Sequence, residues 1–187
     1  MTRENRPESP ERRLSPQEMD RFSECVLPYL DAAYNLARYL LRDPHEAEDA
    51  VQESFLRAIR HFDGFRGVDG RAWLLSIVRN TCFTQLRRRR PGGERVEFDE
   101  EIHSPLEEDS GPEADLTSAN TAESLREVLD QLAIEYREVL VLRELEGLSY
   151  KEIAHVAGVP IGTVMSRLAR GRKQLLLALG AGAKEND

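Results

Sequence analysis

The stretch SYKEIAHVAGVPIGTV, residues 149–164, decides the fold of the C-terminal part of the chain. Ser149 is followed three residues later by Glu152, which is the pattern of a capping box and predicts a helix that begins at Tyr150. Gly158 and Pro160 end that helix after roughly two turns. A second helix is expected to start directly after them.

The spacing within this stretch predicts a helix-turn-helix. Counted from Tyr150, the small Ala154 is the fifth residue, Gly158 the ninth and Val164 the fifteenth. A helix-turn-helix needs a close helix crossing, a left-handed turn and a core anchor at these positions. The three requirements are met together, so we favour this motif over an ordinary helical hairpin.

The second helix of the motif has one apolar and one polar face. From residue 163 to 173 it carries four bases and no acid, which suits the major groove of DNA. We expect the apolar residues to pack and the polar ones to face outward; the alternative is a basic face that is only solvated. The packed set is Val164, Leu168, Gly171 and Leu175, and the outward set, taken as the DNA-binding residues, is Thr163, Ser166, Arg167, Arg170 and Lys173.

The charge distribution divides the chain. Its 187 residues carry a net charge of -8, which alone argues against a nucleic-acid partner. Ten acids and one base lie between Glu94 and Asp115, so the remainder is close to neutral. We therefore predict two small helical domains, residues 19–91 and 121–180, joined by a flexible acidic linker, residues 92–120. The polar segments 1–18 and 181–187 are expected to be tails, the first of them disordered.

Helical periodicity predicts an all-α fold for the N-terminal domain as well. Apolar residues from Val26 to Leu41 recur at intervals of three and four, which indicates one helix from about Met19 to Arg42. Asp43 is expected to cap a second helix, and a third runs from about residue 71 to 90. No stretch alternates at period two for long enough to predict a sheet.

The third helix combines cations with an amide and an aromatic ring. It holds six bases and no acid, and it places Ser76, Arg79, Asn80, Phe83 and Arg87 on one face. Such a face can stack bases and neutralise phosphates of a single strand. The alternatives are plain packing for Trp73 and Phe83, and a solvated helix end for residues 87–90.

Other function classes find little support. Cys25 and Cys82 lie far apart with no CxxC pair, and the four histidines are scattered, so we expect no disulfide, metal site or cofactor. No phosphate-binding loop or zincin motif is present, and we expect no enzyme activity. Without a long apolar run, the protein is expected to be cytoplasmic and not inserted in a membrane.

The motifs of both halves resemble one family. Residues 43–55, DPHEAEDAVQESF, followed by Phe65-Arg66-Gly67 and Trp73-Leu74, look like region 2 of the extracytoplasmic-function (ECF) sigma factors of the sigma-70 family. Residues 136–140, 147–154 and 162–167 resemble their region 4. One departure is Ala133-Ile134, where relatives often have proline before the second helix of region 4.

The resemblance implies an alternative RNA polymerase sigma factor that recognises the minus-10 and minus-35 promoter elements and promotes DNA melting. It places the core polymerase contact, on the β′ clamp helices, at Asp49, Gln52 and Glu53. It places minus-10 binding in the loop and basic helix at Phe65, Arg66, Arg71, Trp73, Arg79, Asn80, Phe83 and Arg87. Region 4 would read the minus-35 element and dock on the β flap, and an anti-sigma factor joins the expected partners.

Two rival classes stay open on the sequence alone. One is a helix-turn-helix regulator that acts without being a sigma subunit, and the other is an adaptor of two helical bundles that does not bind DNA. A simple regulator would more often be a symmetric dimer with a ligand domain. Binding to core RNA polymerase separates these classes from a sigma factor.

Overall fold

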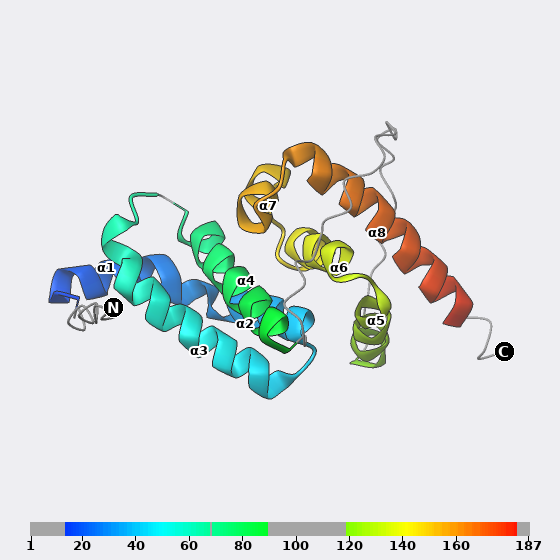
Figure 1. Ribbon diagram of the computed structural model, residues 1–187, viewed down its shortest axis with the longest axis horizontal. Coiled ribbons are helices and arrows are strands. Elements are labelled where there is room, and N and C mark those ends of the chain that lie inside the picture. The colour runs from blue at the N-terminus through cyan, green and yellow to red at the C-terminus, as the bar shows by residue number, and fades with distance from the viewer. Residues whose placement is uncertain (1–13, 68, 90–118, 183–187) are drawn as a thin grey trace, which may run out of the picture.

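The computed structural model describes residues 14–67, 69–89 and 119–182, and every regular element within them is helical (Figure 1). This confirms the predicted all-α class. The N-terminal domain consists of α1 (Pro16–Val26), η1 (Leu27–Tyr29), α2 (Leu30–Leu41), α3 (Pro44–His61), η2 (Phe62–Gly64) and α4 (Gly70–Arg89). The C-terminal domain consists of α5 (Ala119–Gln131), α6 (Ile134–Leu140), η3 (Val141–Leu145), α7 (Tyr150–Ala157) and α8 (Ile161–Gly182).

Most residues of the predicted tails and of the predicted linker lie outside the part of the chain that the structure describes. Positions 1–13, 90–118 and 183–187, which include the whole acidic run, lie outside the described residues. The first domain was predicted to begin at residue 19, but its first helix, α1, begins three residues earlier, at Pro16. Ser15 accepts a hydrogen bond from the Glu18 amide, and the Glu18 carboxylate accepts one from the Ser15 amide, so a capping box starts α1 at Pro16.

The single helix expected from Met19 to Arg42 is in fact two helices. Proline cannot donate a backbone hydrogen bond, and around Pro28 the chain forms the short 3₁₀ turn η1 before α2 begins. Arg42 then ends α2 in the left-handed conformation with a φ of 64°. As predicted, Asp43 caps α3, with its carboxylate accepting from the Glu46 amide at 3.0 Å.

The N-terminal core lies between α2, α3 and α4. Leu36, Ala50, Leu74 and Val78 are fully buried there. At the far end of the domain an aromatic group closes the core, and Phe22 and Phe62 meet edge to face with ring centroids 5.2 Å apart. This group supports the start of the loop that joins α3 to α4.

The C-terminal domain confirms the predicted helix-turn-helix. Ser149 and Glu152 form the capping box of α7, Gly158 adopts the left-handed conformation with a φ of 67°, and Val164 is fully buried. Despite the missing proline, the chain breaks between α5 and α6, because Ala133 is extended and its carbonyl accepts the first hydrogen bonds of α6. Gly171 lets α8 cross α6 closely, since a Cβ atom there would lie 3.1 Å from Leu140 Cδ1.

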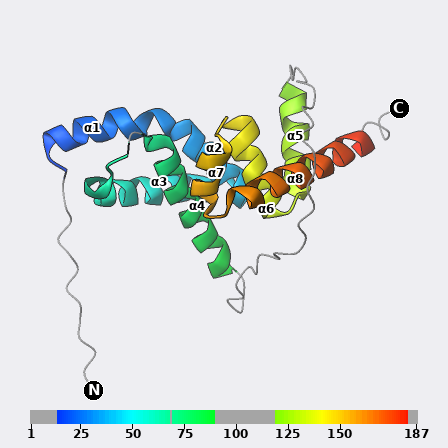
Figure 2. The same cartoon turned by 90° about the horizontal axis from the view of Figure 1, so that it is seen from above.

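The two domains pack against each other. Helix α4 of the first domain lies on α7 of the second, and α2 lies on α5 and α6 (Figures 1 and 2). The helix-turn-helix is thereby placed beside the loop before α4. None of the described helices is long and apolar enough to cross a membrane, and the described side chains contain no cluster of three potential metal ligands.

Candidate nucleic-acid interface

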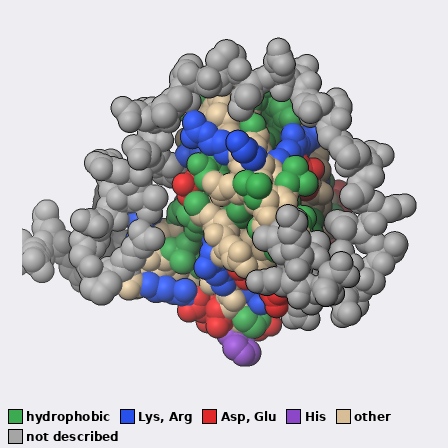
Figure 3. All heavy atoms as spheres, turned by 90° about the vertical axis from the view of Figure 1, so that its right-hand side faces the viewer, with side chains coloured by type: hydrophobic (Ala, Val, Ile, Leu, Met, Phe, Trp, Pro, Cys, Tyr) green, Lys and Arg blue, Asp and Glu red, His purple; other side chains and the backbone are tan. Residues whose placement is uncertain are grey.

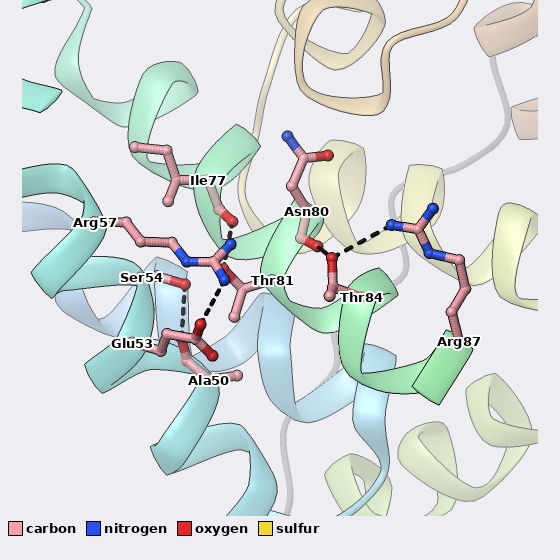
Figure 4. Close-up of polar contacts among 9 residues, drawn as sticks. All are labelled: Ala50, Glu53, Ser54, Arg57, Ile77, Asn80, Thr81, Thr84 and Arg87. Atoms are coloured by element: carbon pink, nitrogen blue, oxygen red, sulfur yellow. Dashed lines mark hydrogen bonds and ion pairs between the residues drawn. The ribbon is translucent and has the colours of Figure 1, made fainter. Parts of the chain in front are cut away.

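The outer face of α3 presents a polar strip to solvent. Asp49 and Gln52 are exposed, and Glu53 forms an ion pair with Arg57 one turn later, with 2.5 Å between its oxygen and the guanidinium nitrogen (Figure 4). On the buried side of the same helix, the Ser54 hydroxyl donates to the Ala50 carbonyl at 2.6 Å. The three residues expected to bind polymerase therefore lie on an accessible strip of a well-anchored helix.

Helix α4 presents the predicted mixture of amide, ring and cations. The Arg79 guanidinium lies over the Phe83 ring at 4.2 Å from its centroid, and Asn80 is exposed. The side chain of Asn80 points away from the residues drawn around it in Figure 4, while its carbonyl accepts from Thr84. Arg87 is exposed and donates to the Thr84 hydroxyl at 3.3 Å. The opposite face, with Leu74, Val78 and Cys82, is fully buried.

In the loop before α4, one of the residues expected to bind the minus-10 element is buried. Phe65 is only 6% exposed, because its ring packs against Trp73 with centroids 4.7 Å apart and against Phe62 at 5.8 Å. Arg66 is exposed beside it. Next to this loop lies a cavity of about 600 Å³. Its lining comes from both domains and consists of Gly64, Phe65, Arg66, Gly67, Asp69, Ala72, Trp73, Lys151, Glu152 and His155.

The recognition helix α8 requires one correction. Ser166, Arg170 and Lys173 are exposed and Thr163 is half-buried, but Arg167 is only 8% exposed. Arg167 turns toward the interior, where burial lowers its pKa and the negative charge of Glu138 opposes that shift. The prediction that Arg167 faces outward is therefore wrong, because a buried acid on a neighbouring helix attracts it.

Glu138 is the residue that sequence reasoning missed. It lies on α6, is fully buried, and one of its oxygens accepts a hydrogen bond from Arg79 Nε of the other domain at 2.6 Å. Burial raises the pKa of Glu138, and the charge and hydrogen bond of Arg79 oppose that rise. The signal in the sequence was an acid directly before the apolar run of residues 139–142.

A second acid of the C-terminal domain also contacts the N-terminal domain. Glu146 is 7% exposed, and its two carboxylate oxygens accept from Arg71 at 2.9 Å and from Asn35 at 3.2 Å. A third pair, between Arg42 and Asp130, joins the domains at 3.5 Å. Two cations of the predicted minus-10 face, Arg71 and Arg79, are thus held by carboxylates of the C-terminal domain.

The surface near the C-terminus exposes hydrophobic side chains as well as charged ones. Figure 3 shows hydrophobic side chains beside Lys and Arg side chains on this face, and acidic side chains gather at its lower edge. Near the C-terminal end of α8 the exposed apolar residues include Leu176, Leu177 and Leu179, of which Leu176 is 70% exposed. These leucines mark a surface that suits contact with another protein.

Comparison with known proteins identifies the family. Residues 25–91 match the protein-family model of Sigma-70 region 2, and residues 122–175 match that of Sigma-70, region 4. The chain is 36% identical over 166 residues to the RNA polymerase sigma-H factor of Pseudomonas aeruginosa, with 84% of this chain and 86% of that protein covered. It is 31% identical to the ECF RNA polymerase sigma factor SigW of Bacillus subtilis, with 84% and 88% covered.

A longer relative and two solved structures agree with these matches. The chain is 37% identical to the ECF RNA polymerase sigma factor SigE of Mycolicibacterium smegmatis, of which it spans 61%. A structure of the sigma factor RpoE with the anti-sigma factor NepR from Bartonella quintana is similar, with a TM-score of 0.67, 29% identity, and 86% and 98% of the two chains covered. CnrH in complex with the cytosolic domain of CnrY is similar with a TM-score of 0.62, 26% identity, and 87% and 90% covered.

The helix-turn-helix and the basic face of α4, on two helical domains, are typical of a transcription factor. The family matches and the relatives narrow this class, and the chain belongs to the sigma-70 family, with ECF RNA polymerase sigma factors as its relatives. The findings support a sigma factor and give no support to a helix-turn-helix regulator outside that family.

Proposed function

We propose that three helices of this sigma factor, α3, α4 and α8, each bind a different partner or promoter element. The exposed strip of α3 with Asp49, Gln52 and Glu53 binds core RNA polymerase. The basic and aromatic face of α4 holds the displaced strand of the minus-10 element, and the exposed residues of α8 read the minus-35 element in the major groove. The observation that carries the proposal is the mixed face of α4, where an exposed amide, a ring and cations lie opposite a fully buried core face.

The proposal extends to partners and location. The similar RpoE structure contains an anti-sigma factor, and we infer that this chain has such a partner. The exposed leucines at the end of α8 provide an apolar surface to which it could bind. We assign the acidic segment between the domains to a basic channel of polymerase, where its charge would mimic that of nucleic acid. The site of action is the cytoplasm, and no catalytic step is assigned to the chain itself.

Transcription in vitro tests the proposal directly. A genomic DNA library from the source organism is incubated with core polymerase, with or without the purified protein, and the 5′ ends of the transcripts are mapped. We expect start sites that depend on the protein and share two upstream sequence elements. Start sites that are the same with and without the protein would contradict the proposal.

A further inference from the structure

We propose that Met165 of α8 recognises a thymine of the upstream promoter element through the 5-methyl group of that base. This inference rests on the proposed function, because it names a chemical group that the recognition helix detects in the minus-35 element. Met165 is 44% exposed on the second turn of α8, and Ile161, one turn earlier, is 42% exposed. The hydroxyls and cations assigned to base and phosphate contacts do not account for these two apolar side chains.

Met165 and Ile161 lie at one edge of the outward face of α8. At about 100° per residue, the positions from Met165 round to Arg170 span about 140° of the helix surface, with Ser166 between them. Val164, which is fully buried, lies on the opposite side. The outward face of the recognition helix therefore has an apolar edge as well as a basic one.

The described residues leave the apolar edge open. An added Cβ atom at Gly162, the residue after Ile161, would have nothing of the described chain within 4 Å. Single apolar residues are common on protein surfaces, but here two lie one turn apart on a helix that carries four bases and no acid from residue 163 to 173. That positive charge suits a DNA duplex, so we infer that promoter DNA covers this edge.

The position of Met165 along α8 suits contact with a base. A long side chain in a helix is directed toward the helix N-terminus, over the preceding turn. In a helix-turn-helix, residues near the N-terminus of the second helix contact the base edges in the major groove. The thioether of Met165 is therefore directed toward the end of α8 that enters the groove.

Thymine is the base that an apolar side chain can select in the major groove. Its 5-methyl group is absent from the other three unmodified bases, and apolar side chains contact it there. The neighbouring polar residues are less suited to this task, because the Ser166 hydroxyl donates to the Thr163 carbonyl at 3.0 Å and Arg167 is only 8% exposed. Met165, with its flexible unbranched side chain, can fit closely around a methyl group.

Replacement of thymine by deoxyuridine tests the inference, because it removes the methyl group and keeps every hydrogen-bonding group of the base pair. Each thymine of the upstream element, on either strand, is replaced in turn in a synthetic promoter duplex, and binding of the holoenzyme with the full-length chain is measured by anisotropy. For the wild type we expect one position at which deoxyuridine weakens binding about fourfold, the effect of withdrawing one methyl group from an apolar contact. With Met165→Ala the same replacement should have no effect, since the contact is already lost.

Two further variants control for changes in apolar surface. Met19 of α1 is 43% exposed, so Met19→Ala removes an equally exposed methionine from the other domain and should keep the full deoxyuridine effect. Met165→Leu retains an apolar contact and should keep the effect as well. A wild type that is indifferent to deoxyuridine at every position, or a Met165→Ala protein with the sensitivity of the wild type, would overturn the inference. Failure of the proposed function gives a different result, because no start sites would then depend on the protein and no upstream element would be found.

Discussion

Gly70, the first residue of α4, packs directly against the backbone of Cys25 on α1, so that a Cβ atom at Gly70 would lie 1.9 Å from the Cys25 carbonyl oxygen. We expect Gly70→Ala to lower the free energy of unfolding by about 1–3 kcal/mol, because a backbone atom cannot move aside as a side chain can. Urea unfolding followed by circular dichroism measures the change. Gly64→Ala is the matched control, since nothing lies within 4 Å of its added methyl group. Equal losses in both variants would contradict the close contact.

Binding of polymerase and opening of DNA should be separable. Glu53→Arg should weaken binding to core polymerase by roughly 2–5 kcal/mol if the partner charge is left buried and unpaired, whereas Glu24→Arg, the same reversal on α1, should not. The double variant Asn80→Ala, Phe83→Ala should bind core polymerase normally but fail to melt the promoter. Permanganate reactivity of unpaired thymines reports melting. Normal melting by the double variant would refute the role given to α4.

Arg167 and Arg170, both on α8, should behave differently. Arg170 is exposed, and Arg170→Ala should cost about 1–3 kcal/mol at one base pair of the upstream element. Arg167→Ala should instead lower the free energy of unfolding, by roughly 3 kcal/mol, because it leaves the buried Glu138 with less compensating charge. Binding to a set of single-base promoter variants, together with urea unfolding, separates the two effects. An Arg167→Ala protein of unchanged stability would show that its burial has no energetic role.

The capping box of α7 should make stability depend on pH. Hydrogen bonds with Ser149 lower the pKa of Glu152 below its ordinary value of 4.5. The stabilisation is therefore complete above that value and is lost as the pH falls through the lowered pKa of the folded state. Ser149→Ala should cost about 1 kcal/mol at neutral pH. In thermal unfolding scans, the wild type and Glu152→Gln should differ more at neutral pH than in acid, and a difference that grows in acid would contradict the assignment.

The two cysteines should react at very different rates. Cys82 is fully buried on α4, and burial raises the pKa of its thiol to about 12. Because the thiolate is the reactive form, Cys82 should stay unlabelled by iodoacetamide near neutral pH until the protein unfolds. Cys25 is half-buried and serves as the internal control. Mass spectrometry of peptides gives both rates, and labelling of Cys82 at the rate of Cys25 would show that α4 opens readily.

Local signals in the sequence predicted the local structure well. The caps at Asp43 and Ser149 and the left-handed turn at Gly158 depend on neighbouring residues, and all three are confirmed. The break at Pro28 and the capping box at Ser15 are local signals as well, but the apolar periodicity continues across Pro28 and the sequence around Ser15 is polar.

The contacts between the domains could not be predicted in this way. Arg79 and Glu138 are 59 positions apart in the chain, and no local rule relates two residues at that separation. The outward position assigned to Arg167 failed for the same reason, because helical periodicity places a residue on a helix but does not show which neighbouring helix covers it. The family resemblance implied the roles of the helices, whereas the packing of α4 on α7 and of α2 on α6 is visible only in the structure.

Trp73 gives the molecule a built-in optical reporter. It is the one tryptophan of the sequence, its ring packs against Phe65 at a tilt of 32°, and it lines the cavity that also includes Lys151 and His155 of the helix-turn-helix. Indole emission shifts with the polarity around the ring, and nearby charged groups can quench it. Tryptophan fluorescence can therefore follow, with no dye attached, any change in the contact between the helix-turn-helix and the loop before α4.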